Sequence, residues 1–344
     1  MRNGVAAALW ILGAMGTAQA QKPVITVATD GKGQFASVQA AVNAAGDKGA
    51  VIRIAPGHYQ EKLRIEKNGI ELRGTGSGPE DVVLEWDDTA KIAGGTTKSA
   101  AVSVIGDDFY AENLTIADLF EKEHPDSPQG GQAVALLISG DREVMRHVRL
   151  LGYQDTLYAN SKSCHANYEP GSPNQPSACH ASRQLFEDCY VAGHVDYIFG
   201  DAKAVFKNCE LHAMSHGVVT ITAQSRLYPA EDSGYLFIDC TISAEKGVHA
   251  LSLGRPWRAY ARTYFVNTTV KKGASVDESG WMEWDHKLAT SDYAEYNTHD
   301  ENGRPVSVGG RSPFSHQLTK TDADKLSVSA WLAGPDGWDP ENVK

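Results

Sequence analysis

Short runs of hydrophobic residues with polar ends recur along the middle of the chain. The clearest copies read LFEDCYV, VFKNCEL and LFIDCTI, at 185–191, 205–211 and 236–242, and YFVNTTV at 264–270 has Thr268 in the cysteine position. FYAENLTI at 109–116 and EVMRHVRLL at 143–151 are weaker copies. Runs of this length, rich in aromatic and β-branched residues, predict short β-strands.

The spacing of the clear copies, at intervals of 20, 31 and 28 residues, indicates how these strands are arranged. Each interval is about the length of one coil of a solenoid, and stacked coils place equivalent positions above one another. A β-sandwich would also contain many short strands, but its strands need not repeat the same residue at the same offset. We therefore predict an all-β fold, a parallel β-helix, rather than a sandwich.

Three other segments have a different pattern. FASVQAAVNAA, from Phe35 to Ala45, has helical apolar spacing and a possible cap at Ser37, so a helix is expected to cover the first coil. Between Asn160 and Ala181 the chain is rich in proline and poor in apolar residues, which predicts an inserted loop over 161–180. The polar tail from about Ser291 is expected to run back along the outside of the solenoid.

The five cysteines lie between Cys164 and Cys240. Stacked coils bring equivalent positions to roughly 5 Å, close to the usual Cα separation across a disulfide, so Cys189 and Cys209 are predicted to pair. Cys164 and Cys179 would close the inserted loop, and Cys240 would be a free thiol. The alternative is that the three repeat cysteines are simply small buried side chains.

The N-terminus has the features of an export signal. Arg2 precedes an apolar stretch that ends near Met15, and Ala18-Gln19-Ala20 fits a cleavage site, so residues 1–20 are interpreted as a signal peptide. The expected product is a single domain over 21–344, secreted or periplasmic, without a membrane span. Loss of Arg2 lowers the formal charge from −11 by one, to −12, and no basic patch suggests a nucleic-acid partner.

The candidate chemistry consists of polar residues in apolar settings. Asp196 lies within the otherwise apolar GHVDYIFG, where an ionised carboxylate is costly to bury without a partner. The others are Gln132 in GGQAVALLI, Gln154 and Asp155 in LGYQDTLYA, and Arg255 in SLGRPWRAY. On one face of a β-helix these five could converge in a groove. The chain has no HExxH, EF-hand spacing or G-x-S-x-G elbow.

Taken together, these residues resemble the pectin methylesterase family of carbohydrate esterases. The matching runs, in order, are TVATDGKGQFASVQAAV, GHYQEKL, GQAVAL, GYQDTLY, GHVDYIFGDAKAVFKNC, TITAQSR, LGRPW and GWMEW. They cover nearly the whole chain after the signal peptide. The resemblance implies a right-handed parallel β-helix that hydrolyses methyl esters of galacturonate in pectin, acts as a monomer, and uses neither a metal nor another cofactor.

On the matching positions, the resemblance implies a role for each residue. Asp196 would be the nucleophile, Asp155 the general acid and then base, and Arg255 would orient Asp196. Gln132 and Gln154 would stabilise the oxyanion. The substrate would contact Trp257, Phe199, Val195 and Tyr158.

The sequence departs from the family pattern in two places. The aspartates are 41 residues apart, more than the single coil that the family usually places between them, and the excess corresponds to the inserted loop. Tyr197 stands where the family often has Phe, which adds a hydroxyl near the nucleophile. A carboxylate is a weak nucleophile that must be ionised and aimed, a task for which the rigid donor fork of Arg255 is suited.

Other functions are compatible with a β-helix. A lyase on the same polymer would need a calcium-binding carboxylate cluster, and an inverting glycosidase would need two carboxylates spaced for a water. A related esterase or thioesterase could use the same residues on another acyl group. A non-catalytic carbohydrate-binding β-helix would have no need of Asp155.

Overall fold

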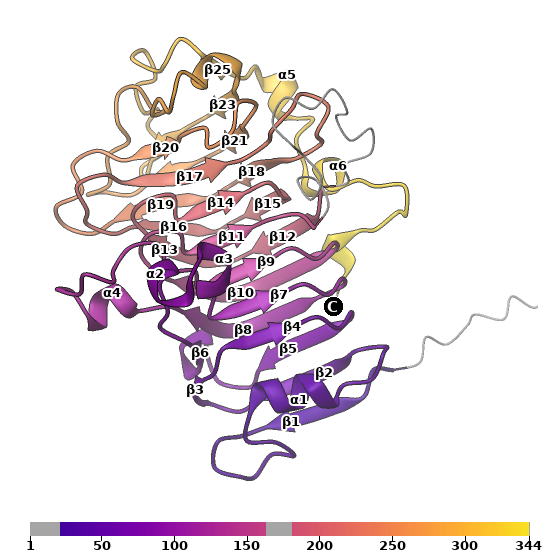
Figure 1. The fold of residues 1–344 in the computed structure, drawn as a ribbon. Coiled ribbons are helices and arrows are strands. Elements are labelled where there is room, and N and C mark those ends of the chain that lie inside the picture. Colours follow the sequence, from indigo (N-terminus) through magenta and orange to yellow (C-terminus); the bar gives the residue numbers. More distant parts are fainter. Residues whose placement is uncertain (1–20, 163–180, 344) are drawn as a thin grey trace, which may run out of the picture.

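The chain forms a parallel β-helix in which short strands stack coil upon coil from the N-terminal to the C-terminal end (Figure 1). The computed structural model describes residues 21–162 and 181–343. Its named strands pair in parallel and belong to an 18-stranded and a 7-stranded sheet. The all-β fold expected from the repeats is confirmed.

The strands follow three rows along the solenoid. The first row contains β1 (Val24–Val27), β2 (Ala50–Ile54), β5 (Ile70–Gly74), β12 (Arg183–Glu187), β15 (Lys203–Lys207), β18 (Gly234–Ile238), β21 (Arg262–Val266), β23 (Asp292–Tyr296) and β25 (Ser315–Gln317). The second contains β3 (Gly57–Gln60), β6 (Val82–Glu85), β13 (Tyr190–Gly193), β16 (Glu210–Ala213), β19 (Thr241–Ala244), β22 (Thr269–Val270) and β24 (His299–Asp300). Two long strands, β8 (Tyr110–Ala117) and β10 (Glu143–Leu151), bend from the first row into the second.

The third row is the 7-stranded sheet. It consists of β4 (Leu63–Ile65), β7 (Val102–Val104), β9 (Leu136–Ile138), β11 (Leu157–Ala159), β14 (Ile198–Gly200), β17 (Thr220–Gln224) and β20 (Ser252–Gly254). The helices are α1 (Val38–Ala44), α2 (Ala90–Ala93), α3 (Thr96–Ser99), α4 (Phe120–Glu123), α5 (Lys320–Ala323) and α6 (Val328–Trp331), with 3-10 turns at Pro79–Asp81, Leu288–Thr290 and Pro340–Asn342.

The corner between the first two rows explains the Asp or Asn before each repeat cysteine. One residue per coil adopts a left-handed conformation there, with φ between 49° and 55°, at Asn113, His147, Asp188, Asn208, Asp239, Asn267 and Asn297. Asn and Asp tolerate this conformation better than most side chains. They also bond along the stack: the Asn267 amide donates to the Asp239 carboxylate at 3.0 Å, and the Asn297 amide to the Asn267 oxygen at 3.0 Å.

Aromatic rings at equivalent positions stack inside the solenoid. Phe186 lies 4.7 Å from Phe206, Phe206 lies 4.5 Å from Phe237, and Phe237 lies 4.4 Å from Phe265, measured between ring centroids. All four side chains are fully buried. Stacked rings and aliphatic residues thus form one continuous core, as the repeat predicts.

The predicted disulfide between Cys189 and Cys209 is wrong. Cys189, Cys209 and Cys240 are all free and buried, and each thiol donates to a backbone carbonyl, as Cys209 Sγ does to Phe186 at 3.3 Å. Strands in register lie about 4.8 Å apart with parallel side chains, whereas a disulfide needs Cβ atoms about 3.8 Å apart and converging. The alternative is confirmed: the three repeat cysteines are small buried side chains without a disulfide. The predicted Cys164–Cys179 pair lies outside the described residues.

The predicted N-terminal helix is present as α1, and Ser37 is its cap. The Ser37 hydroxyl accepts from the Ala40 amide at 3.2 Å. The Glu61 carboxylate accepts from the Val38 and Gln39 amides at 2.9 and 3.0 Å, which satisfies further donors at the positive end of the helix. The buried residues of α1 belong to the main core cluster, so its apolar face covers the first coil.

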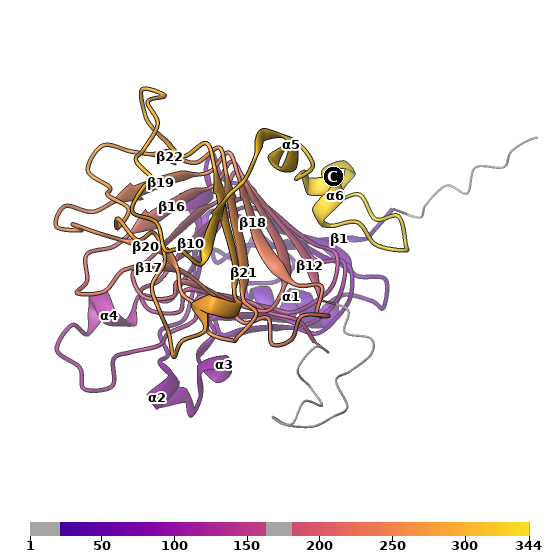
Figure 2. The ribbon, with the colours of Figure 1, turned by 90° about the horizontal axis from the view of Figure 1, so that it is seen from above.

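The tail turns back later than predicted. Instead of leaving the solenoid at Ser291, the chain adds β23, β24 and β25, and Tyr293 is wholly buried against Trp281 at 4.2 Å. Only after Gln317 does it return along the outside, where α5 and α6 lie beside the first row (Figure 2). There Trp331 and Leu332 pack in one apolar cluster with outward side chains of the first row, such as Leu185.

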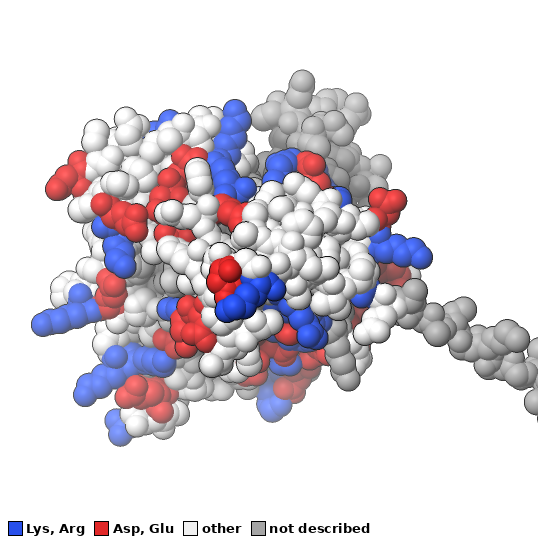
Figure 3. Space-filling model, turned by 90° about the horizontal axis from the view of Figure 1, so that it is seen from below, with Lys and Arg blue, Asp and Glu red and all other residues white. Residues whose placement is uncertain are grey.

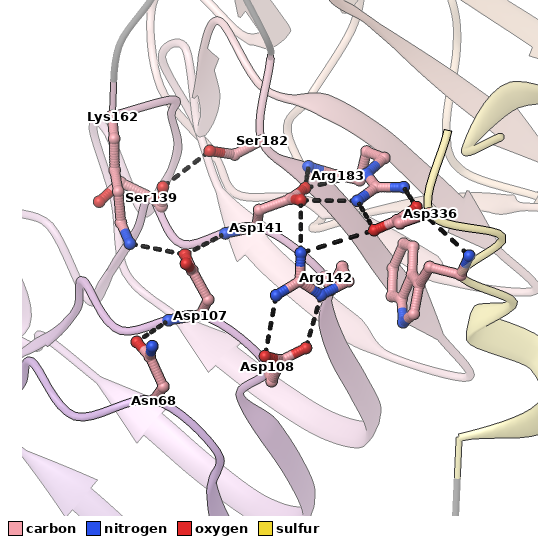
Figure 4. A network of polar contacts seen from close by, with 11 residues as sticks. Asn68, Asp107, Asp108, Ser139, Asp141, Arg142, Lys162, Ser182, Arg183 and Asp336 are labelled. Atoms are coloured by element: carbon pink, nitrogen blue, oxygen red, sulfur yellow. Dashed lines mark hydrogen bonds and ion pairs between the residues drawn. The ribbon is translucent and has the colours of Figure 1, made fainter. Parts of the chain in front are cut away.

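A network of ion pairs fastens the end of the tail to the coils beneath it (Figure 4). Both terminal nitrogens of Arg183 donate to Asp336 at 2.7 Å, and Arg183 also bonds Asp141. Arg142 continues the network to Asp108 at 2.6 Å. The bonds from Arg183 hold the pKa of the Asp336 carboxyl below its usual value. This is a forked, charge-assisted contact between distant parts of the sequence.

Acidic and basic side chains are mixed on the surface at the N-terminal end, and this face shows no continuous basic area (Figure 3). In the described part of the chain, no helix has the length and apolar character needed to cross a membrane.

Candidate active site

The two aspartates occupy equivalent positions in consecutive coils. β11 and β14 pair in parallel with Leu157 opposite Ile198, so the offset of 41 residues places Asp155 directly beside Asp196. The Asp155 amide donates to the Val195 carbonyl at 3.1 Å. The aspartates are therefore neighbours despite their separation in sequence.

Both aspartates precede a strand rather than lie in one. Asp155 has φ 69° and Asp196 has φ 50°, a left-handed conformation that costs a non-glycine residue about 1–3 kcal/mol and is often found at functional sites. Within GHVDYIFG the strand β14 begins only at Ile198. The apolar residues on either side fix the turn that carries Asp196.

Arg255 compensates the charge of Asp196. Its Nε donates to Asp196 Oδ1 at 2.8 Å and its Nη2 donates to Oδ2 at 2.7 Å. The Asp196 residue is 6% exposed, so this forked ion pair is largely shielded from water. Arg255 follows β20, whose pairing with β17 sets its position, and Asp196 is thereby fixed in orientation.

The two carboxyls differ in their tendency to hold a proton. Burial raises the pKa of Asp155 well above its ordinary value, and the neighbouring Asp196 charge raises it further. Burial also raises the pKa of Asp196, but the bonds and charge of Arg255 oppose that increase. Of this coupled pair, Asp155 is the residue that holds a proton first, and Asp196 is the residue that ionises first.

These groups open into a cavity of about 430 Å³ on the outer face of the third row. Its lining consists of Thr96, Thr97, Gln132, Gln154, Asp155, Tyr158, Asp196, Phe199, Ala223, Arg255, Trp257 and Trp284. The side-chain amides of Gln132 and Gln154 make no hydrogen bond to another described residue, so they are free to donate to a ligand. The cavity thus brings together two carboxyls, a guanidinium and two free amides.

Aromatic rings form one wall of the cavity. Tyr158 and Phe199 stack at 4.2 Å, and Trp257 is tilted against them at 6.4 and 5.9 Å. Flat apolar rings beside polar groups suit a sugar, whose C–H faces are apolar and whose edges carry hydroxyls. These three predicted substrate contacts therefore lie where a sugar ring could pack.

One predicted contact does not lie in the cavity. Val195 is buried and is absent from the lining. Its amide donates to His194 Nδ1 at 2.8 Å and its carbonyl accepts from Asp155. The backbone of Val195 thus links the two coils that carry the aspartates.

Three polar or aromatic residues that line the cavity were not predicted from the sequence. Trp284 ends the GWMEW run, and its ring lies 4.3 Å from the guanidinium carbon of Arg255, on which it can act by cation–π attraction. The signal for Trp284 was present in that motif. Thr96 and Thr97 belong to α3, in the segment that connects a strand of the second row to one of the third row. No motif in the surrounding sequence indicates that they line a site.

Tyr197 also points away from the cavity. Its side chain is fully buried, and its hydroxyl has no hydrogen-bond partner among the described residues. We expect Tyr197→Phe to raise the free energy of unfolding by about 1 kcal/mol, because it removes an unpaired buried hydroxyl, and to leave the kinetics unchanged. Urea unfolding and ester hydrolysis would be measured together. A loss of activity in a stable variant would place the hydroxyl in the reaction.

A cluster of three acids lies apart from the cavity. Oxygens of Glu85, Asp87 and Glu123 lie within 4.8 Å of one another, at the end of β6 and in α4. Glu85 is also 3.0 Å from His58, and none of the three lines the cavity. A lyase would need such a cluster at its reacting centre, so its position gives that alternative no support.

A β-helix with a buried pair of carboxyls, a guanidinium clamp and two amides in a cavity fits a carboxylic ester hydrolase. The profile of the pectinesterase family matches residues 24–167 and 176–335. The chain belongs to this family.

Individual relatives agree with this assignment. The chain is 33% identical over 328 residues to the pectinesterase QRT1 of Arabidopsis thaliana, covering 92% of this chain and 78% of the relative. Six other plant relatives are longer, and the chain spans between 51% and 58% of each.

Solved structures also agree. A pectin methylesterase from carrot has a TM-score of 0.77 and 28% identity, covering 91% of this chain and 94% of that one. A pectin methylesterase in complex with a hexasaccharide has a TM-score of 0.71 and 28% identity, covering 94% and 99%.

Proposed function

We propose that this chain hydrolyses methyl esters of galacturonate residues in pectin and releases methanol, with Asp196 as the nucleophile. The observation that carries the proposal is the forked Arg255–Asp196 pair beside Asp155 in a cavity with two free amides. That one relative was solved with a hexasaccharide supports a sugar polymer as the ligand.

In the first half of the reaction, an oxygen of Asp196 attacks the ester carbonyl carbon. The carbonyl electrons move onto the oxygen, and the amides of Gln132 and Gln154 donate to this oxyanion. Loss of one such donor typically raises the barrier by about 2.7–4 kcal/mol. The C–O bond to the methoxy group then breaks, Asp155 gives its proton to the departing oxygen, and methanol leaves. The product is an anhydride between Asp196 and the galacturonate.

In the second half, Asp155 is a carboxylate and acts as a base. It takes a proton from a water molecule, the hydroxide oxygen attacks the anhydride, and the bond to Asp196 breaks. Galacturonic acid, ionised Asp196 and protonated Asp155 result, and the acid then gives its proton to the solvent. The cycle returns both carboxyls to the states that their surroundings favour, because burial raises the pKa of Asp155 and Arg255 opposes that rise in Asp196.

Three products measured on one substrate test the proposal. Highly methyl-esterified pectin would be incubated with the protein, and methanol, reducing ends and unsaturated-product absorbance would be followed. We expect methanol and an equal amount of acid, without the other two signals. Unsaturated product would indicate a lyase, new reducing ends a glycosidase, and no product a binding protein or an esterase with another substrate.

The organisation of the whole chain follows as part of the same proposal. The proposal includes action as a monomer. Residues 21–344 would form one esterase domain that is secreted or periplasmic. The proposed signal peptide, residues 1–20, lies outside the described part.

A further inference from the structure

Arg258 differs from the other cations around the catalytic cavity. Arg255 is held by Asp196, and the Lys287 ammonium lies 3.1 Å from Asp285. The Arg258 guanidinium has no carboxylate within ion-pair distance among the described residues. Within the described ranges, its one side-chain hydrogen bond goes to the carbonyl of Trp257, at 3.3 Å from Nη1.

The position of Arg258 is defined by the wall of the cavity. Its guanidinium carbon lies 4.6 Å from the centre of the Trp257 ring, and Trp257 lines the cavity whereas Arg258 does not. Its charge also lowers the pKa of Tyr158, on the same wall, against the larger effect of burial. The guanidinium therefore lies against the Trp257 ring, at the edge of the cavity.

The chemistry of the polymer decides what a free guanidinium could bind there. Each galacturonate carries a neutral methyl ester or, after hydrolysis, a carboxylate, and the reacting sugar must carry the ester. A planar guanidinium can bind a carboxylate through two parallel hydrogen bonds. Stacking on Trp257 attracts the cation and orients the plane of the fork, while no described residue occupies its remaining donors.

We propose that Arg258 binds the free carboxylate of a galacturonate adjacent to the sugar whose ester occupies the cavity. Arg258 thereby makes the enzyme favour esters that have an already hydrolysed neighbour. The inference rests on the proposed function. In a chain with a formal charge of −11, a cation that no described acidic residue pairs with, at the edge of this cavity, is a local attraction for an anionic ligand.

The test compares two substrates for each protein. One is a fully methyl-esterified galacturonate oligomer, and the other is the same oligomer after partial alkaline de-esterification. For Arg258→Gln we expect kcat/KM on the partly de-esterified oligomer to fall about fivefold, mainly through KM, the scale of a partly exposed arginine–carboxylate pair. On the fully esterified oligomer it should stay within about twofold. Arg258→Lys should retain part of the preference, because it keeps the charge and loses the fork.

Lys287→Gln is the matched control, since it removes one positive charge from the same region but from a cation already paired with Asp285. It should change both substrates by the same small factor. An equal fall on both substrates in Arg258→Gln, or the same selective fall in Lys287→Gln, would overturn the proposal. If the unaltered protein released no methanol from either oligomer, the proposed function itself would fail, and the role of Arg258 with it.

Discussion

Replacement of Asp196 by Asn is expected to abolish methanol release, with kcat lowered by at least about 10⁴-fold, while the protein stays folded. Asn has nearly the same shape but an uncharged amide, which cannot attack the ester. When catalytic residues act as one unit, removal of the nucleophile alone abolishes most of the rate acceleration. Activity would be measured as methanol, and folding by thermal unfolding.

A folded Asp196→Asn protein with substantial activity would remove Asp196 as the nucleophile. The adjacent Tyr197→Phe variant is the control, because it alters the same segment on the side that faces the core and is expected to remain fully active. Comparison of these two variants separates a chemical effect at residue 196 from a disturbance of the turn before β14.

Replacement of Arg255 by Gln has the second largest expected effect, a fall in kcat/KM of about 10²-fold or more. The variant loses both bonds that aim the Asp196 carboxylate, and truncation of one partner of a buried charged pair typically costs 2–5 kcal/mol. Arg255→Lys should recover only part of the rate, since a single ammonium cannot reproduce the fork.

The pH dependence gives the Arg255 prediction a specific sign. Arg255 opposes the rise that burial causes in the pKa of Asp196, so its removal should raise that pKa further. Because Asp196 must be ionised to react, the acid limb of the kcat/KM profile should move to higher pH in Arg255→Gln. An acid limb that stays in place, or moves to lower pH, would contradict the assignment of that limb to Asp196.

The fold was predictable because the repeat reflects a local backbone requirement. Asp188, Asn208, Asp239 and Asn267 share a left-handed corner, and only a few residue types are comfortable there. The tail was not predictable, because only the corner residue Asn297 continues the repeat there. In β23, Ala294 and Glu295 stand opposite Tyr264 and Phe265, so the aromatic pattern of the earlier copies is lost. In the sequence, Tyr293 is one of several isolated aromatic residues in a polar segment. In the structure it is buried and stacks on Trp281.

The site was predictable where chemistry fixes the residue type. Asp196 and Arg255 are costly in their apolar surroundings unless they meet, and they do. The disulfide prediction failed because it relied only on the distance between stacked coils. The side chains of Cys189 and Cys209 run parallel, whereas a disulfide needs them to converge. Val195 is not among the residues that line the cavity, and its contact with the substrate stays a prediction.

The most direct test of the account is to trap the acyl-enzyme that a nucleophilic Asp196 must form. Hydroxylamine, added in increasing amounts during hydrolysis of methyl-esterified pectin, would compete with water for the anhydride, and a protein-free control would give the background. If Asp196 is the nucleophile, galacturonyl hydroxamate will appear at the expense of free acid, while Asp196→Asn will form none above background. Continued methanol release with one acid formed per methanol, and no enzyme-dependent hydroxamate at any concentration, would contradict it.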